Sequence, residues 1–179
     1  ILEAMAAGDL DTGVDPVSGD LLDMSAPSGE SKINSVCLVT DVGRVTDGGF
    51  NQSAYEGMLA AAADYNLDNK YIETQAQTDY EANLNTCIDE GFDTVVTVGF
   101  LIYDATIAAA KANPDVFFIG VDQFPAEAVA NFAGIQFRED QAGFLAGVIA
   151  AQLSASGKIG GVYGIDIPPV KKFRNGFEQ

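Results

Sequence analysis

The residues with the most chemical potential lie in the segment 41–53, which directly follows the apolar run 36–39. This segment contains Asp41, Asp47, Phe50 and Asn51, and it leads into a stretch with helical spacing. In open α/β sheets, ligands bind at the loops that leave the carboxyl ends of the strands. The segment is poor in positive charge, but it offers carboxylates, amides and an aromatic ring. Such a set favours a neutral, flat ligand with hydroxyl groups over a phosphate.

Two further positions fall at the ends of later apolar runs. Asp122 follows the run 116–121, and Gly99 follows the run 94–98. Because the carboxyl ends of parallel strands meet at one edge of a sheet, we expect Asp41 and Asp122 at the same edge. Their carboxylates could accept charge-assisted hydrogen bonds from ring N–H or sugar hydroxyl groups. Two alternatives stay open: the aspartates as helix caps or turn residues, and Gly99 as a tight turn instead of a close approach to a ligand.

Phe50 also has two interpretations. It follows Gly48 and Gly49 and precedes Asn51, so its ring could stack on a base from an exposed loop. Such stacking is worth about 1–3 kcal/mol per base in proteins that bind single strands. The alternative is a hydrophobic staple that packs the loop onto the sheet. Asp47 either caps the following helix or closes the loop.

Paired carboxylates also suggest glycoside hydrolysis, which needs one protonated and one ionised acid beside the scissile bond. No other catalytic group supports that chemistry, because the chain has no histidine, the commonest general base and metal ligand. The glycines spell no dinucleotide fingerprint, and no phosphate-loop lysine is present. We therefore expect a protein without catalytic activity, without a metal and without a cofactor.

The charge of the chain excludes one class of partner. Its 26 acidic and 9 basic residues give a formal net charge of −17. A surface this acidic repels nucleic acids, which are bound through lysine and arginine contacts to phosphate. No apolar run approaches the roughly 20 residues that a membrane-spanning helix needs.

The elements that position these residues alternate along the chain. Apolar runs typical of strands and stretches with helical spacing follow one another after residue 32. Near-continuous apolar strands between helices predict a parallel sheet that is covered on both faces. The expected strands are 33–40, 70–74, 94–98, 116–121, 129–135 and 159–164, and the expected helices are 52–65, 80–90, 103–112, 138–156 and 170–179.

Three regions are expected. Residues 1–32 are rich in Asp, Gly, Ser and Pro, which predicts an acidic, disordered tether. A calcium loop beginning at Asp9 fails, because its glycine comes one position early and no glutamate closes it. Residues 33–157 are expected to form an α/β lobe, and residues 158–179 the first strand and helix of a second lobe.

The two cysteines, Cys37 and Cys87, match no metal spacing. In a sheet of order 2-1-3-4-5, the crossover from the second strand to the third passes over the first strand. This would lay Cys87 against the strand that contains Cys37, so a disulfide is geometrically possible. Two separately buried thiols remain the favoured interpretation.

Seven segments together resemble the basic membrane protein family of bacterial substrate-binding lipoproteins, which contains purine-nucleoside receptors of ABC transporters. The resemblance runs from about residue 33 to the end of the chain. One departure is Gly48-Gly49, where the family commonly has a lysine and a small residue, so we expect a more flexible loop here. The matching segments are DVG at 41–43, DGGFNQS at 47–53, GFDTVVTVGF at 91–100, ANPDVFFIGVD at 112–122, GFLAGVIAA at 143–151, GKIG at 157–160 and PVKKFRNGF at 169–177.

The resemblance implies a periplasmic-binding-protein type 1 fold, in which two Rossmann-like lobes close over one ligand. By this likeness a nucleoside base stacks on Phe50, while Asn51 and Asp122 bond its edge. Asp41 and the backbone of Gly99 line the cleft, Phe173 lies near it, and second-lobe groups beyond this chain hold the ribose.

The same resemblance implies an exported monomer that delivers its ligand to a membrane permease. A lipid-modified cysteine before Ile1 would anchor it to the membrane. A receptor of the same fold for a sugar or an autoinducer is the alternative function.

Overall fold

Apolar strands alternate with helices in the computed structural model, which describes residues 33–125 and 127–179. The predicted tether, residues 1–32, lies outside this part. Contacts divide the chain into two units, one ending at Ile135 and the other spanning Gln136–Gln179.

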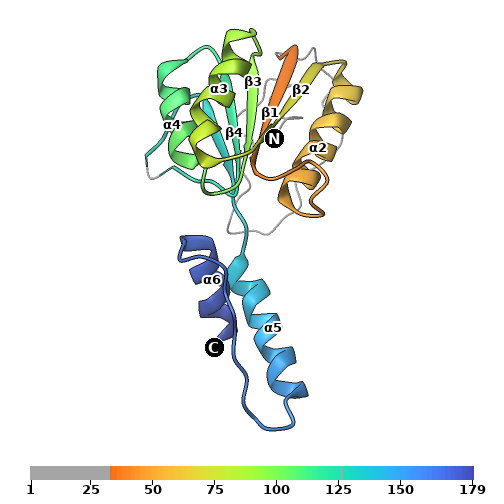
Figure 1. Ribbon diagram of the computed structural model, residues 1–179, viewed down its shortest axis with the longest axis vertical. Coiled ribbons are helices and arrows are strands. Elements are labelled where there is room, and N and C mark those ends of the chain that lie inside the picture. The colour runs from red at the N-terminus through yellow and green to blue at the C-terminus, as the bar shows by residue number, and fades with distance from the viewer. Residues whose placement is uncertain (1–32, 126) are drawn as a thin grey trace. The chain divides into compact units, whose positions relative to one another are not determined.

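The first unit is built on one parallel sheet in the order β2-β1-β3-β4-β5 (Figure 1). This confirms the predicted order. Because the strands are parallel, all their carboxyl ends lie at the same edge of the sheet. The strands are β1 (Ser35–Val42), β2 (Asp68–Thr74), β3 (Thr94–Val98), β4 (Phe117–Val121) and β5 (Phe132–Ile135).

Helices cover both faces of this sheet, as the near-continuous apolar strands predict. On one face, α2 (Phe50–Tyr65) packs Met58 and Ala62 against the sheet. On the other, α3 (Tyr80–Asp89), which follows the short helix η1 (Gln77–Asp79), packs beside α4 (Tyr103–Ala112). Alternate residues of β1 serve the two faces, with Leu38 directed to the α2 side and Cys37 to the α3 side.

The cysteines correct one prediction. Cys37 on β1 and Cys87 on α3 form a disulfide, with their Cα atoms 5.8 Å apart. The interpretation as two separate thiols is therefore wrong, because α3 lies directly over β1 and brings the sulfurs into bonding range. The bridge closes a loop with a sequence separation of 50 residues. Loop-closure entropy assigns such a bridge about 4 kcal/mol of stabilisation.

The second unit consists of α5 (Glu139–Leu153), α6 (Pro168–Phe177) and the chain between them. The two helices approach closely because glycines face the partner backbone, with Gly143 against Phe173 and Gly147 against Phe177. Lys172 on α6 forms an ion pair of 3.3 Å with the buried Glu139. The boundary between the units thus falls at residue 135, before α5, whereas the sequence predicted it at residue 157.

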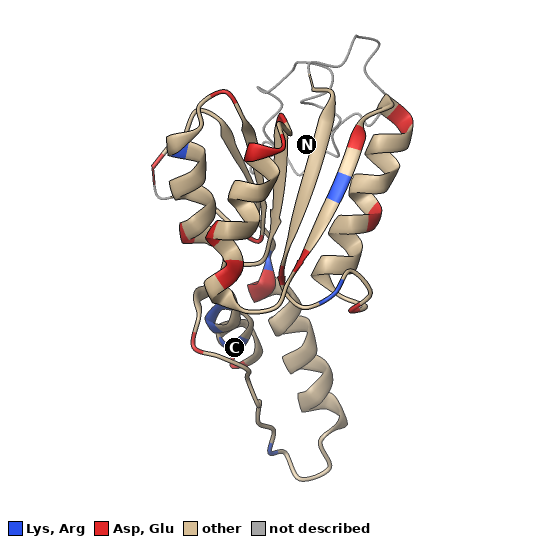
Figure 2. Ribbon diagram, turned by 45° about the horizontal axis from the view of Figure 1, so that its top comes forward, with Lys and Arg blue, Asp and Glu red and all other residues tan. Residues whose placement is uncertain are grey.

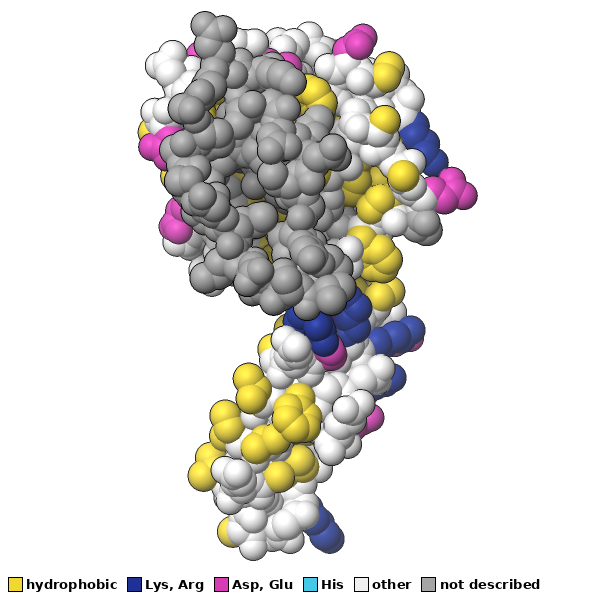
Figure 3. Space-filling model, turned by 180° about the vertical axis from the view of Figure 1, so that it is seen from behind, with side chains coloured by type: hydrophobic (Ala, Val, Ile, Leu, Met, Phe, Trp, Pro, Cys, Tyr) yellow, Lys and Arg dark blue, Asp and Glu magenta, His cyan; other side chains and the backbone are white. Residues whose placement is uncertain are grey.

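The expected strand 159–164 is absent from the described chain. A strand needs a hydrogen-bonded neighbour, and the described part of the second unit offers none. The second unit also leaves apolar side chains exposed, which gather on the face shown in Figure 3. On α5 these are Phe144, Leu145, Val148, Ile149 and Leu153.

The remaining elements match the predicted ones to within a few residues at their ends. Helix α2 begins two residues earlier than expected, at Phe50. Helix α6 begins on Pro168 and Pro169, because the first turn of a helix needs no backbone N–H donors. None of the described helices has the length and apolar character to cross a membrane.

Candidate functional site

An irregularity near the end of β1 shapes the candidate site. Val39 pairs with Ile72 and Val42 with Thr74, so β1 contains one more residue than β2 in this stretch. Such a bulge bends the strand and redirects its side chains. The buried Thr40 replaces the missing ladder contacts, since its hydroxyl accepts from the N–H of Thr74 at 3.0 Å. It also lies 3.3 Å from the carbonyl oxygen of Gly43, to which it donates. The bulge leaves Asp41 at the carboxyl edge.

The two oxygens of the Asp41 carboxylate have different surroundings. Oδ1 accepts from the backbone N–H of Val42 at 2.7 Å and from the hydroxyl of Tyr80. A methyl group on Gly99, at the end of β3, would overlap Oδ2. The φ angle of Gly99, +94°, is also one that other residues rarely adopt. Asp41 and Gly99 therefore meet at the carboxyl edge of the sheet, a contact that the sequence did not predict.

Tyr80 is the partner that sequence reasoning missed. It begins α3, and only 5% of the residue is exposed. Burial, the hydrogen bond to Asp41 and the charge of Asp41 raise the pKa of Tyr80 well above its usual value of 10.0. The phenol therefore keeps its proton at neutral pH and remains a donor to the carboxylate.

Asn51 connects α2 to β1. It lies in the first turn of α2 with 4% of its surface exposed. Its side-chain oxygen accepts from the backbone N–H of Asp41 at 3.0 Å. The amide thus holds Asp41 in place from the opposite side to Tyr80, a contact that the sequence did not predict.

Phe50 precedes Asn51 as the first residue of α2, and it is 51% exposed. A hydrophobic staple would bury the ring, so the exposed position favours the stacking interpretation. Phe50 is the neighbour in sequence of Asn51, whose side chain accepts a hydrogen bond from the backbone N–H of Asp41.

Asp47 closes the loop before α2. Its Oδ1 accepts from the N–H of Gly49 at 2.7 Å and of Gln52 at 3.1 Å, which satisfies donors of the first helical turn. Burial by itself would raise the pKa of Asp47, but these backbone hydrogen bonds outweigh it and lower the pKa below 3.8. The Gly48 N–H donates to the side chain of Gln52 at 2.9 Å, so the loop is tied to the helix at two points.

Asp122 lies next to these groups at the same edge. The N–H of Gly99 donates to the carbonyl oxygen of Val121 at 2.9 Å, and Asp122 follows immediately. Asp122 has a φ of 60°, a left-handed conformation that aspartate tolerates better than most residues. The prediction that Asp41 and Asp122 share one edge is therefore confirmed by the strand order, in which β3 separates β1 from β4.

Gln123 is a further residue that the sequence did not single out. It is fully buried, and its Nε2 donates to the Thr97 hydroxyl at 3.1 Å and the Gly99 carbonyl at 2.9 Å. Its Oε1 has no hydrogen-bond partner among the described residues. The Gln123 side chain thus fixes the backbone carbonyl of Gly99.

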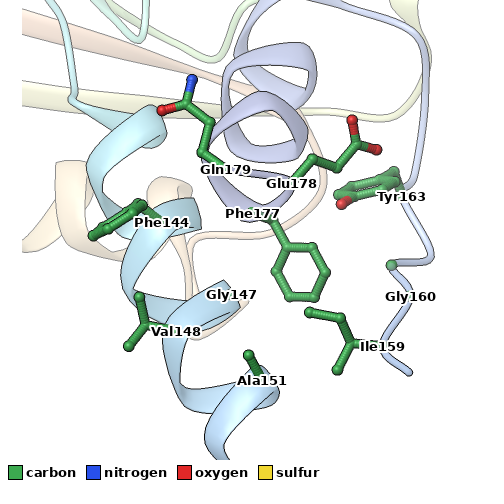
Figure 4. A pocket seen from close by; sticks show the side chains of 11 residues that line it. Phe144, Gly147, Val148, Ala151, Ile159, Gly160, Tyr163, Phe177, Glu178 and Gln179 are labelled. Carbon is green, nitrogen blue, oxygen red and sulfur yellow. The ribbon is translucent and has the colours of Figure 1, made fainter. Parts of the chain in front are cut away.

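Phe173 lies in the second unit, on α6, and is 41% exposed. The other five predicted residues belong to the first unit, so the place of Phe173 beside the ligand stays a prediction. The second unit also contains a hollow of about 600 Å³, lined mainly by apolar residues from α5, α6 and the chain between them (Figure 4). None of the six predicted site residues lines it.

The site has the chemistry of a binding site for a neutral molecule. It presents carboxylates that accept hydrogen bonds, a glycine backbone and an exposed ring, and the segment 41–53 contains Arg44 as its only basic residue. The described residues contain no group of three or more metal-ligating side chains.

Comparison with known proteins identifies the family. A family model described as ABC transporter substrate-binding protein PnrA-like matches residues 34–179. The chain belongs to this family.

Curated relatives of this PnrA-like chain agree with that assignment. The ABC transporter nucleoside-binding protein BmpA of Lactococcus lactis is 33% identical over 160 residues, covering 87% of this chain and 45% of the relative. Basic membrane protein A of Borreliella burgdorferi is 33% identical over 150 residues, covering 83% of this chain and 44% of the relative. The chain thus spans less than half the length of these relatives.

Solved structures show the fold of the PnrA-like chain. An ABC transporter solute-binding protein from Aeropyrum pernix superposes with a TM-score of 0.72 at 31% identity, covering 80% of this chain and 41% of that one. A sugar-transport substrate-binding protein from Bordetella parapertussis shares the fold at 17% identity, with a TM-score of 0.61 over 82% of this chain and 48% of that one. The chain therefore has the periplasmic-binding-protein type 1 fold, as the resemblance implied.

Proposed function

We propose that the protein binds nucleosides, with a preference for purines, as the substrate-binding component of an ABC importer. The observation that carries this proposal is the group at the carboxyl edge, where Asp41, Asn51 and Gly99 meet beside the exposed ring of Phe50. A base has a flat face for the ring and N–H groups for the carboxylates. The Lactococcus relative is named as a nucleoside-binding protein, which supports the same ligand class.

The roles of the individual residues follow from their positions. The base stacks on Phe50, Asn51 and Asp122 bond its edge, and Asp41 and Gly99 line the cleft. Phe173 contributes from the second unit, which belongs to a second lobe. The exposed apolar side chains of α5 support this assignment, because they need further structure to bury them.

The cellular setting is part of the proposal. The protein is exported, anchored by a lipid and bound as a monomer to its permease, and it turns over no ligand. The disulfide supports export, because such bonds persist in oxidising compartments.

Phe50 provides the direct test. In the full-length protein, replacing Phe50 by leucine should weaken inosine binding by about 1–3 kcal/mol, because the apolar bulk remains but the stacking face is lost. Phe50→Tyr is the matched control, since it keeps the ring and should leave the affinity within about threefold of the original. Calorimetry with inosine, adenosine, guanosine and ribose measures both.

Three results would count against the proposal. Equal inosine affinities for the leucine and tyrosine variants would remove the stacking role. Tighter binding of ribose than of any nucleoside would favour the sugar-receptor alternative. Release of free base during incubation, detected by chromatography, would indicate an enzyme.

A further inference from the structure

The carboxylate of Asp41 is held asymmetrically. Its Oδ1 accepts two hydrogen bonds, from the Val42 N–H and the Tyr80 hydroxyl, while none of the described residues donates to Oδ2. Oδ2 lies over the glycine at the end of β3. One oxygen is thus used internally, and the other is left without a donor among the described residues at the edge of the sheet where the ligand is proposed to bind.

Tyr80 has little freedom to move away from Asp41. It begins α3, and Cys87, seven residues later on the same face of the helix, is bonded to Cys37 on β1. Asp41 follows Cys37 by four residues on that strand. The disulfide and the Tyr80–Asp41 hydrogen bond therefore attach α3 to β1 at two points. The Tyr80 side chain is buried.

The phenol is also chemically suited to the role. Its raised pKa keeps it protonated at neutral pH, so it donates steadily to the carboxylate. A carboxylate that has lost this donor can rotate about its terminal bond, because this torsion is broad in aspartate. Rotation would turn Oδ2 away from Gly99.

We propose that Tyr80 is a positioning residue for ligand binding, which holds the Asp41 carboxylate so that Oδ2 accepts a hydrogen bond from an N–H or O–H donor of the ligand. The proposal rests on the nucleoside-binding function proposed above. Tyr80 is buried and its hydroxyl proton is donated to Oδ1, so in this proposal it acts on the ligand through Asp41.

A double-mutant cycle in the full-length protein tests this role. Equilibrium dialysis with labelled inosine measures the affinities of the original protein, Tyr80→Phe, Asp41→Ala and the double variant. Tyr80→Phe keeps the buried ring, and we expect it to weaken binding about tenfold, as expected when a hydrogen bond to a charged group is lost. In the Asp41→Ala background the same change should alter the affinity by less than about twofold, because no carboxylate remains to be oriented.

The control is Tyr71→Phe, which removes a hydroxyl from β2, where Tyr71 is 44% exposed, and should leave inosine binding unchanged. A Tyr80→Phe effect of equal size in both Asp41 backgrounds would assign Tyr80 a merely structural role and overturn the proposal. No effect of Tyr80→Phe alongside a large effect of Asp41→Ala would overturn it too, while leaving the nucleoside site intact. A full-length protein that binds none of the nucleosides would overturn both proposals.

Discussion

At the scale of single residues, the site is organised around one carboxylate. Asn51 accepts from the backbone of Asp41, Tyr80 donates to its side chain, and Gly99 makes room for it. Gln123 in turn holds the carbonyl of Gly99. Each contact has a different chemical type, so a conservative substitution can remove one of them and leave the others in place.

The Tyr80–Asp41 hydrogen bond should make the free energy of unfolding depend on pH in the alkaline range. The pKa of Tyr80 is raised in the folded protein above 10.0, so the bond stabilises the fold fully below that pH and is lost as the pH rises through the raised value. Near-ultraviolet absorbance follows the ionisation of tyrosines with pH. Subtracting the titration curve of Tyr80→Phe from that of the original protein isolates the ionisation of Tyr80. We expect its ionisation to move to lower pH in Asp41→Asn, because a neutral partner no longer opposes the phenolate charge. Identical curves for the two Asp41 forms would contradict the contact.

At the scale of elements, the close approach of α5 and α6 depends on glycine. A methyl group on Gly143 would overlap the backbone carbonyl of Phe173, and one on Gly176 would overlap that of Asp140. Backbone atoms cannot move aside as a flexible side chain can, so these helices have no room for larger residues. In α2, by contrast, Gly57 has no atom within 4 Å of the position of an added methyl group.

This contrast predicts opposite effects of the same substitution. Gly143→Ala should lower the free energy of unfolding by about 1–3 kcal/mol, because the helices must separate or distort. Gly57→Ala should raise it by about 0.5–1 kcal/mol, because alanine loses less backbone entropy in a helix than glycine does. Urea denaturation of the full-length variants measures both. Stabilisation by Gly143→Ala would show that the two helices do not pack this closely in solution.

At the scale of the whole molecule, charge is unevenly distributed. The net charge is −17, yet the second unit contains five of the nine basic residues: Arg138, Lys158, Lys171, Lys172 and Arg174. Figure 2 shows acidic residues spread over the helices and strand ends of the first unit. Like charges at this density repel one another and destabilise the folded state at low ionic strength.

Salt should therefore stabilise the protein. Raising the ionic strength from 0.01 M to 0.15 M shortens the screening length from about 30 Å to about 8 Å and weakens this repulsion. We expect the midpoint of thermal unfolding to rise with sodium chloride over this range. A variant with Asp64→Asn, Asp89→Asn and Asp115→Asn, three exposed sites of the first unit, should show a smaller rise. A midpoint that is independent of salt in both proteins would contradict the prediction.

The sequence by itself determined the α/β class, the positions of nearly all elements and the edge at which Asp41, Gly99 and Asp122 lie. These properties depend on local patterns: apolar runs end where Asp41, Gly99 and Asp122 begin, and a parallel sheet collects such ends. The expected strand 159–164 failed because a strand depends on a partner that local pattern does not reveal.

Only the tertiary structure decided which side chains meet. The disulfide depends on how α3 lies over β1, and the boundary between the units depends on α5 packing against α6. The contact of Tyr80 with Asp41 depends on the same packing of α3 over β1. These contacts join residues that are 39 and 50 positions apart in the chain. The spacing of residues along the sequence does not show which of them come together in space.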